Sequence, residues 1–530
     1  MENFDRSSSG FNETLWNDSS ARPQFPELNS HVNTETVIVG AGIAGLSIAY
    51  CLAKAGRKVV VIEDGEICSG ETGRTTAHVV NALDDRYFEI ERTFGAEKSR
   101  LAAESHTAAI NFIESTIKSE GIDCDFKRVS GYLFLHPSDK LKNIQSEYEA
   151  TRQAGISTEL LPSVPGITTH EGPCLHFPNQ AQFHPVKYCI GLANAIVKAG
   201  GQIFCNSHVN KISKESVEGN GFRVTAEDIV IATNSPINDM VTMHTKQHAY
   251  RSYVIAAEVP KGSVEAALWW DTGDMHSTWV SKPYHYVRTQ PFNETSDLLI
   301  VGGEDHKTGQ SEKEDLREEQ RYILLEQWAR TNFPMITNIA YTWSGQVLEP
   351  VDMLGFIGVN PGDENIYIAT GDSGNGMTHG TIAGLLITDL IMGRTNPWES
   401  LYDPSRITLS AASDFLKEAG NMAVQYLDYF TAGELDSVNA IAPGSGAVIR
   451  TSFMKVAVYK DEQGQVHPFS AVCPHLGCYV HWNNDERSFD CPCHGSRFSC
   501  EGKVMNGPAL SDLKPLDVNE VQKNEAKGTS

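Results

Sequence analysis

The sequence has no long apolar stretch and no surplus of positive charge. No segment of the 530-residue chain approaches the roughly 20 apolar residues that span a bilayer, and residues 1–31 lack the apolar centre of a secretion signal. Lysine and arginine total 43 against 67 aspartate and glutamate, a net charge of -24, which repels nucleic acid and anionic lipid. We therefore expect a soluble, cytoplasmic protein whose partners are neither membranes nor nucleic acids.

Cysteine is sparse over most of the chain and concentrated near its end. Of the 11 cysteines, six are scattered singly before residue 210 and five lie in the last 60 residues. The scattered ones exclude a disulfide framework and fit reduced thiols in a cytosol. With 40% apolar and 21% charged residues, the chain is of ordinary globular composition, and its length predicts about three domains.

The clustered cysteines follow a metal-ligand pattern. A C-x-H arm begins at Cys473 and a C-x-x-H arm begins at Cys491. Mixed thiolate and imidazole ligands suit either zinc or the asymmetric Rieske [2Fe-2S] cluster. The spacing favours iron, because structural zinc would leave Cys478 and Cys493 without a role. Structural zinc and chance spacing of surface cysteines are the alternatives.

Residues 440–520 resemble the Rieske iron-sulfur domain of the cytochrome bc type, including a third loop at Gly507-Pro508-Ala509. Ser496 stands where high-potential members have a serine. The resemblance implies a disulfide between Cys478 and Cys493, which ties the first two loops together. It also implies that two cysteines hold one iron and two histidines the other: Cys473, Cys491, His475 and His494.

A dinucleotide-binding pattern opens the ordered part of the chain. Residues 36–39 predict a strand, residues 40–45 (GAGIAG) a tight turn into a helix, and residues 59–62 a second strand that delivers Glu63. Gly40 permits the turn, Gly42 lets backbone NH groups approach a pyrophosphate, and Gly45 lets helix and strand pack closely. Glu63 would accept hydrogen bonds from a ribose. A glycine-rich turn without a ligand is the alternative.

Three further segments resemble the flavin-contacting parts of the D-amino-acid oxidase (DAO) superfamily, whose members oxidise glycine, sarcosine, dimethylglycine and other amines. They are residues 68–78, 343–358 and 366–380, and the resemblance covers about residues 35–405. It implies non-covalent FAD, a solvated loop position for His78, and a helix at 381–392 that directs its positive end at the flavin. The implied FAD contacts are Gly40, Ala41, Gly42, Ile43, Ala44, Gly45, Glu63, Arg74, Thr75, Thr76, Val209, Gly345, Gly376, Met377 and Thr378.

Strand patterns at 250–259, 278–289 and 298–303 predict part of a substrate sheet. Period two puts Tyr284, Tyr286 and Arg288 on one face of the middle strand, where they could bind a substrate carboxylate. Ordinary aromatic sheet residues are the alternative, and no catalytic residue is identified. The segment 211–226 is short for the β-hairpin expected there, so either the hairpin is trimmed or the sequence has lost some residues. Residues 311–332 predict a helix with a solvated face.

The predicted fold is an α/β FAD-binding domain of the two-dinucleotide-fold type with an interleaved mixed substrate sheet, joined to a small all-β Rieske domain. We expect a disordered tail at 1–31 and the DAO-type FAD-binding and substrate domain at 32–408. A helix and linker follow at 409–439, with the helix itself over 410–430, and the Rieske [2Fe-2S] domain occupies 440–525. The two domains are expected to fold separately.

Together, FAD and a [2Fe-2S] cluster predict an oxidoreductase for a small amine, amino acid or related C–N or CH–OH metabolite. Electrons would pass from FAD to the Rieske cluster and on to a one-electron acceptor or to oxygen. One alternative is an NAD(P)H-dependent reductase, but that needs a second dinucleotide fold and only one GxGxxG is present. The other is a non-enzymatic redox sensor, against which the complete set of cluster ligands argues.

Overall fold

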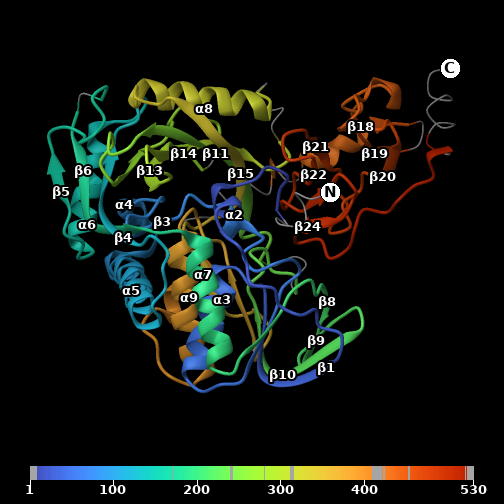
Figure 1. The fold of residues 1–530 in the computed structure, drawn as a ribbon, viewed down its shortest axis with the longest axis horizontal. Coiled ribbons are helices and arrows are strands. Elements are labelled where there is room, and N and C mark those ends of the chain that lie inside the picture. The colour runs from blue at the N-terminus through green and yellow to red at the C-terminus, as the bar shows by residue number, and fades with distance from the viewer. Residues whose placement is uncertain are drawn as a thin grey trace.

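The computed structural model describes residues 9–170, 172–238, 243–279, 281–310, 316–408, 420–421, 424–451, 454–519 and 521. Figure 1 shows a larger part, coloured blue to amber, and a smaller orange-to-red part at one end. Among the described residues, no helix is long and apolar enough to cross a membrane.

The larger part is built on a mostly parallel sheet with strand order β16-β17-β10-β1-β2-β7. Along this path, only the β16–β17 pair is antiparallel. Continuous apolar runs such as β2 suit strands that are covered on both faces. The strands are β1 (His31–Val39), β2 (Val59–Ile62), β7 (Gln202–Phe204), β10 (Phe222–Ile231), β16 (Phe356–Val359) and β17 (Ile366–Thr370).

A short meander extends this sheet. The strands β8 (Val209–Ile212) and β9 (Ser216–Gly219) pair with each other, and β9 pairs with β10. The hairpin expected between residues 211 and 226 is therefore present in a trimmed form.

Three helices lie side by side on the parallel sheet (Figure 1): α3 (Ile43–Lys54), α7 (Pro185–Lys198) and α9 (Gly376–Ile391). The helices α3 and α9 approach closely because α9 carries glycines where they meet. A Cβ at Gly380 would lie 3.0 Å from the Ala44 nitrogen, and one at Gly384 would lie 2.9 Å from the Ser47 Cβ. The helix α9 begins at Gly376, before the predicted start at residue 381.

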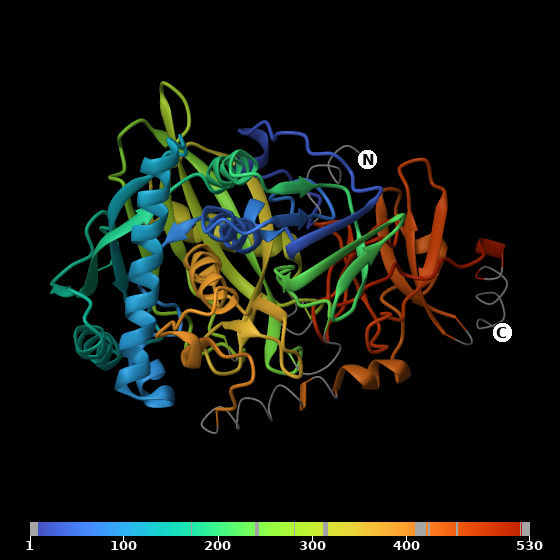
Figure 2. The same ribbon diagram turned by 90° about the horizontal axis from the view of Figure 1, so that it is seen from below.

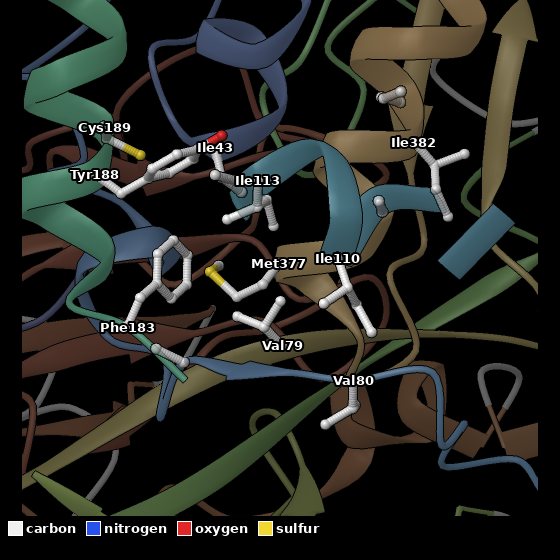
Figure 3. Packing of buried hydrophobic residues seen from close by; sticks show 14 of the residues in the cluster. Ile43, Val79, Val80, Ile110, Ile113, Phe183, Tyr188, Cys189, Met377 and Ile382 are labelled. Atoms are coloured by element: carbon white, nitrogen blue, oxygen red, sulfur yellow. The ribbon is translucent and has the colours of Figure 1, made fainter. Parts of the chain in front are cut away.

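The apolar core between these helices is drawn in Figure 3. Ile43 of α3, Met377 of α9 and Tyr188 of α7 lie close to Ile110 and Ile113 of the long helix α5 (Ala96–Glu120). The core fixes the start of α3 and of α9 relative to each other. Those two helix starts flank the cavity described below.

The second sheet has nine strands, eight of them in the order β15-β11-β14-β13-β12-β4-β6-β3, with β5 on β6. The middle strand β13 begins at Tyr286, and residues 281–285 carry no strand, so the strand predicted at 278–289 is wrong in its first half. The strands are β3 (His78–Val79), β4 (Lys127–Phe134), β5 (Glu159–Leu161), β6 (Cys174–Gln182), β11 (Gln247–Pro260), β12 (Ala267–Asp271), β13 (Tyr286–Pro291), β14 (Ser296–Lys307) and β15 (Asn338–Pro350).

The helix α8 (Glu318–Asn332) covers one face of the second sheet (Figure 1). The prediction of a solvated face is only half right, because Arg321, Leu325 and Ala329 are buried on its inner side. The remaining described helices are α2 (Leu15–Asp18), α4 (Tyr87–Phe94), α6 (Leu141–Gln153), α10 (Glu399–Tyr402) and the short 3-10 turns η1 (Glu71–Gly73), η4 (Tyr426–Phe430) and η5 (Val438–Ala440).

The smaller part is all-β in its main elements. It has a three-stranded antiparallel sheet, β18-β19-β20, and a four-stranded one, β21-β22-β23-β24. The strands are β18 (Ser445–Arg450), β19 (Lys455–Lys460), β20 (Val466–Ser470), β21 (His481–Asn483), β22 (Ser488–Asp490), β23 (Arg497–Ser499) and β24 (Val504–Asn506).

Residues 9–31 are packed against both parts, so the predicted flexible tail is wrong for this stretch. Trp16 is fully buried and its indole NH donates to the Thr75 carbonyl, while the carbonyl of Ser9 accepts from Arg497 of β23. Residues 1–8 lie outside the described part. Most of the helix predicted at 410–430 lies there too, at residues 409–419 and 422–423.

Candidate functional site

The turn between β1 and α3 has the geometry that a dinucleotide phosphate needs. Gly40 has φ +105, which is strained for other residues, and a Cβ at Gly45 would lie 1.9 Å from the Gly40 carbonyl oxygen. The turn can therefore close tightly against the first turn of α3, whose NH groups are an anion site. Gly42 faces a cavity that runs from this turn to the second sheet.

Glu63 follows β2 and also lines this cavity. Its carboxylate accepts hydrogen bonds from the NH groups of Ala41 at 2.5 Å and Gly65 at 3.3 Å. Burial raises the pKa of Glu63 to about 7, although these hydrogen bonds act in the opposite direction. The residues present thus fit an adenosine-containing cofactor, with a phosphate cradle and a ribose acceptor side by side.

Most of the residues predicted to contact FAD meet at this one cavity. Ala41, Gly45 and Thr378 do not line it: Ala41 and Gly45 support the turn, and the Thr378 hydroxyl hydrogen-bonds His106 Nδ1 at 2.8 Å. The predicted FAD contacts that line the cavity are Gly40, Gly42, Ile43, Ala44, Glu63, Arg74, Thr75, Thr76, Val209, Gly345, Gly376 and Met377.

Arg74 lines the cavity, but its guanidinium group is directed to the other domain. It forms an ion pair with Glu486, with both side chains fully buried, and it also donates to the carbonyls of Ser344 and Asn12. Its charge is therefore neutralised within the protein, and the expectation that this side chain serves the cofactor is not supported.

The three substrate candidates separate in the structure. Tyr284 and Tyr286 line the cavity, whereas Arg288 does not. Arg288 is fully buried and donates to the backbone carbonyls of Thr76, Ala77 and Phe183. The prediction that Arg288 binds a substrate carboxylate is therefore wrong, because its donors already serve the backbone.

His78 also differs from its prediction as a solvated loop residue. It lies in β3 and lines the cavity, with its ring nitrogens 3.0 Å from Thr76 Oγ1 and 3.3 Å from the Val287 carbonyl oxygen. Burial lowers the pKa of His78 to about 3, and the positive charge of Arg288 contributes. It is therefore a neutral wall residue.

The part of the cavity next to the second sheet is acidic and aromatic, and sequence reasoning missed its acidic residues. Trp270 joins the two tyrosines there, and the Tyr284 hydroxyl donates to Asp84 at 2.5 Å. The carboxyl groups of this wall come from four separate segments of the chain. The sequence alone therefore shows only one acidic pair, at positions 84 and 85. The acidic residues that line this part are Asp84, Asp305, Glu349 and Asp372.

Burial raises the pKa of each of these carboxyl groups, to about 6 for Asp84 and Asp372 and about 7 for Asp305. Burial also raises the pKa of Glu349, and repulsion from Asp85 adds to this effect. Arg74 is the only arginine or lysine among the described residues that line the cavity. The charges of Arg86 and His285, which do not line the cavity, only partly offset the effect of burial on the pKa values of Asp84 and Asp305. This wall therefore has four carboxyl groups and, among the described residues, no lysine or unpaired arginine beside them in the cavity.

The two cysteine loops of the smaller part bring their ligands together. Cys473 and Cys491 are buried in one cluster, close enough for their side chains to interact, and the ring centroids of His475 and His494 lie 4.8 Å apart. The Nε2 of His494 is buried without a hydrogen-bond partner in the described part of the chain. Two thiols and two imidazoles at one place are the donor set of a Rieske cluster.

The disulfide that the resemblance implied, between Cys478 and Cys493, is present. The sulfurs of Cys478, Cys491 and Cys493 lie within 4.8 Å of one another. Because two of them are bonded to each other, only Cys491 of this group can hold a metal. This leaves the predicted ligands as the consistent set and disfavours structural zinc.

The two parts meet at both sites. Residues 504–507 and 509–510 of the smaller part line the cavity of the larger one, and His244 of the larger part lies against both cluster histidines. Its ring is 5.2 Å from that of His475 and 6.2 Å from that of His494. The views in Figures 1 and 2 show this contact along one side of the larger part. Each cofactor site is thus walled partly by the other domain.

Comparison with family models decides the family. The model described as FAD dependent oxidoreductase (DAO) matches residues 35–390. This chain belongs to the DAO family of FAD-dependent oxidoreductases. The model of the Rieske [2Fe-2S] domain matches residues 432–517 of the same chain. The protein is therefore an oxidoreductase whose cofactors are FAD and a [2Fe-2S] cluster.

Similar proteins include one that this chain matches over nearly its whole length. This DAO-family chain is 32% identical to the Rieske 2Fe-2S iron-sulfur protein YhfW of Bacillus subtilis over 96% of this chain and 98% of YhfW. It is 27% identical to gamma-glutamylputrescine oxidoreductase of Escherichia coli, over 70% of this chain and 86% of that protein. Glycine oxidase from Geobacillus kaustophilus shares the fold, with a TM-score of 0.59 at 17% identity over 71% of this chain and 99% of that one.

Proposed function

We propose that the protein dehydrogenates a positively charged amine at the flavin and passes the electrons through the Rieske cluster to a one-electron acceptor. The observation that carries the substrate class is the acidic, aromatic wall of the cavity. Asp84, Asp305, Glu349 and Asp372 belong to this wall, and the only arginine among the described residues that line the cavity is paired with Glu486. A cationic substrate supplies the charge that this wall lacks, whereas a carboxylate would be repelled.

The aromatic residues add to this preference. Tyr284, Tyr286 and Trp270 line the same wall, and aromatic faces attract ammonium groups. The name of the related gamma-glutamylputrescine oxidoreductase also refers to an amine. An amine with two nitrogens suits the arrangement best, because one ammonium group can stay paired while the other nitrogen is the one oxidised.

The carboxyl groups can also accept the proton that a substrate ammonium group must release. Bound FAD supplies the chemistry by accepting hydride from the carbon next to the nitrogen, which requires that nitrogen to be uncharged. Asp84 and Asp305, with pKa values raised by burial to about 6 and about 7, are suited to accept the proton that the ammonium group must release. Tyr284 orients Asp84 through its hydroxyl hydrogen bond.

A second cavity gives a route for the substrate. It shares Asp84, Tyr284 and Glu349 with the first and is also lined by Asp139, Glu89 and Tyr250. The Tyr284–Asp84 pair therefore stands between the two cavities. Six carboxyl groups line this second cavity against three basic side chains, Arg86, Arg92 and Lys282, among the described residues. A cation entering by this route would therefore pass more acidic than basic groups before it reached the flavin.

The test is anaerobic mixing of the purified protein with alkyl diamines of increasing length, N-methyl amines, amino acids and hydroxy acids, followed by flavin absorbance. We expect diamines to bleach the flavin fastest. Asp84→Asn and Asp305→Asn should each weaken the apparent affinity by about ten- to a hundredfold, the effect of losing one charge-assisted hydrogen bond.

The matched control is Asp297→Asn, on the same strand as Asp305 but paired with Lys261 at the surface. It should behave like the parent. Fast bleaching by amino acids or hydroxy acids with no response to diamines would contradict the proposed substrate class. Flavin reduction by NADH alone would instead support the reductase alternative.

A further inference from the structure

We propose that Gln346 is the bridge by which electrons cross from the flavin cavity to the cluster, and that they enter the cluster on its histidine side. The proposal rests on the proposed transfer from FAD to the Rieske cluster and adds its route. Gln346 lies on β15 directly after Gly345, and both residues line the cavity. Its side chain reaches the other domain, where Nε2 donates to the Gly495 carbonyl at 3.1 Å.

Two further hydrogen bonds, one from the side chain and one from the backbone, fix Gln346 in this orientation. Its Oε1 accepts from the Thr308 hydroxyl at 3.1 Å, and its backbone NH donates to Glu71 at 2.7 Å. The side chain is only 4% exposed. One ordered side chain therefore joins the wall of the flavin cavity to the backbone of the second cluster loop without intervening solvent.

The acceptor of this hydrogen bond is next to a cluster ligand. Gly495 directly follows His494, and its NH donates to the carbonyl of the other loop ligand, Cys491, at 3.1 Å. A Cβ at Gly495 would lie 2.2 Å from the Ala249 Cβ, and its φ is +78, so only glycine lets the loop come this close to the larger part. The close approach thus occurs where the bridge is made.

The packing of the cluster histidines gives the side of entry. His244 contacts both His475 and His494 from the larger part. The histidine side of the cluster therefore faces the domain that holds the flavin.

The proposed transfer moves two electrons from each substrate molecule, one at a time, through the cluster. The amine loses a hydride, so two electrons reach the flavin, and a [2Fe-2S] cluster takes up one electron at a time. Each electron crosses by Gln346 and reduces one ferric ion, and a soluble one-electron redox protein or small one-electron oxidant then removes it before the next electron crosses. The proton that the hydride would carry to the flavin is released into the cavity solvent as the electrons leave, so no proton has to cross to the cluster.

The experiment uses the full chain with both cofactors bound. A light pulse in the presence of deazaflavin and EDTA delivers less than one electron per chain. The phase of cluster reduction whose rate does not depend on protein concentration then reports electron transfer within the chain. We expect Gln346→Met, which keeps the length but removes the donor, to slow this phase several-fold. The midpoint potentials of flavin and cluster are measured for each variant, so that a change in driving force is recognised.

The matched control is Gln310→Met. Gln310 is also buried and also donates to a carbonyl of the same loop, that of Pro492 at 2.9 Å, but it does not line the flavin cavity. It should leave the rate unchanged. If Gln346→Met reduces flavin content, Thr308→Val, which removes the hydroxyl that orients the amide, should give the slowing with flavin retained.

Equal rates in Gln346→Met and the parent would overturn the bridge while leaving the proposed function intact. Equal slowing in Gln310→Met would also overturn it, because the effect would then belong to domain docking as a whole. A parent protein with no internal phase, although both cofactors are bound, would overturn the proposed transfer and the bridge together.

Discussion

Single hydroxyl groups and single glycines decide what each cofactor site can do. Ser496 is fully buried, its oxygen accepts from the Ala509 NH at 3.0 Å, and its hydroxyl lies in hydrogen-bond contact with the Cys473 thiol. A hydroxyl that donates to a ligand sulfur stabilises the reduced, more negative cluster. The potential of the cluster therefore depends in part on this one atom.

We expect Ser496→Ala to lower the midpoint potential of the cluster, within the Rieske range of about -150 to +300 mV. The measurement is a redox titration of the full chain. Ser499→Ala is the control, because that hydroxyl accepts from the NH groups of Glu501 and Lys503 rather than serving a ligand. An unchanged or higher potential in Ser496→Ala would count against the hydrogen bond.

Gly42 should be essential for the other cofactor. Gly42→Val places a branched side chain where the cavity wall is formed by backbone, with Thr72 Oγ1 only 3.0 Å from the new Cβ. We expect loss of FAD with retention of both irons, because the new Cβ meets only Thr72 within 4 Å and touches neither cluster loop. Flavin and iron content of the purified variant test this, and normal flavin occupancy would refute the assignment of the turn.

At the scale of elements, a buried charge cluster clamps the turn between β21 and β22 onto the second sheet. Glu486 pairs with Arg74 and, at 3.3 Å, with Arg251, and it accepts from the Ser344 hydroxyl at 2.6 Å. Although burial acts to raise its pKa, these arginines and Arg497 lower it to about 2. The clamp needs the ionised carboxylate.

Glu486→Gln should destabilise the docked arrangement by about 3–5 kcal/mol, because it leaves buried guanidinium groups without their partner. The parent should also lose stability in acid. The folded pKa lies below the ordinary value of about 4.3, so the stabilisation is present above pH 4.3 and is lost as the pH falls towards 2. Denaturant unfolding at several pH values measures both effects, and a variant with parental stability and the same acid dependence would contradict them.

The elements also show what the sequence can predict. The phosphate turn at Gly40 and the loops at Cys473 and Cys491 are recognisable because each short segment carries its own chemistry. The orientation of Arg288 cannot be predicted in this way. The period-two pattern places Arg288 on one face of the strand, but it does not show that its guanidinium group donates to backbone carbonyls of other segments. The Arg74–Glu486 pair joins residues 412 positions apart, and such docking contacts leave no local pattern.

At the scale of the molecule, the two domains share the walls of both cofactor sites. Residues 504–507 and 509–510 of the smaller domain help to wall the flavin cavity, and the N-terminal stretch from residue 9 contacts both domains. The expectation that the domains fold separately stays a prediction, because contacts in the folded chain do not test it. Their docking places the histidine side of the cluster towards the flavin.

The account's central claim is that electrons from an amine reach the cluster within one chain. The most direct measurement is an anaerobic titration of the FAD- and iron-loaded protein with the diamine that bleaches the flavin fastest, followed by flavin absorbance and the electron paramagnetic resonance signal of the reduced cluster. We predict that the cluster signal appears and that each chain takes up one electron more than Cys473→Ala, which has lost a cluster ligand. A fully bleached flavin beside a cluster that stays oxidised, although its measured potential lies above that of the flavin, would contradict the account.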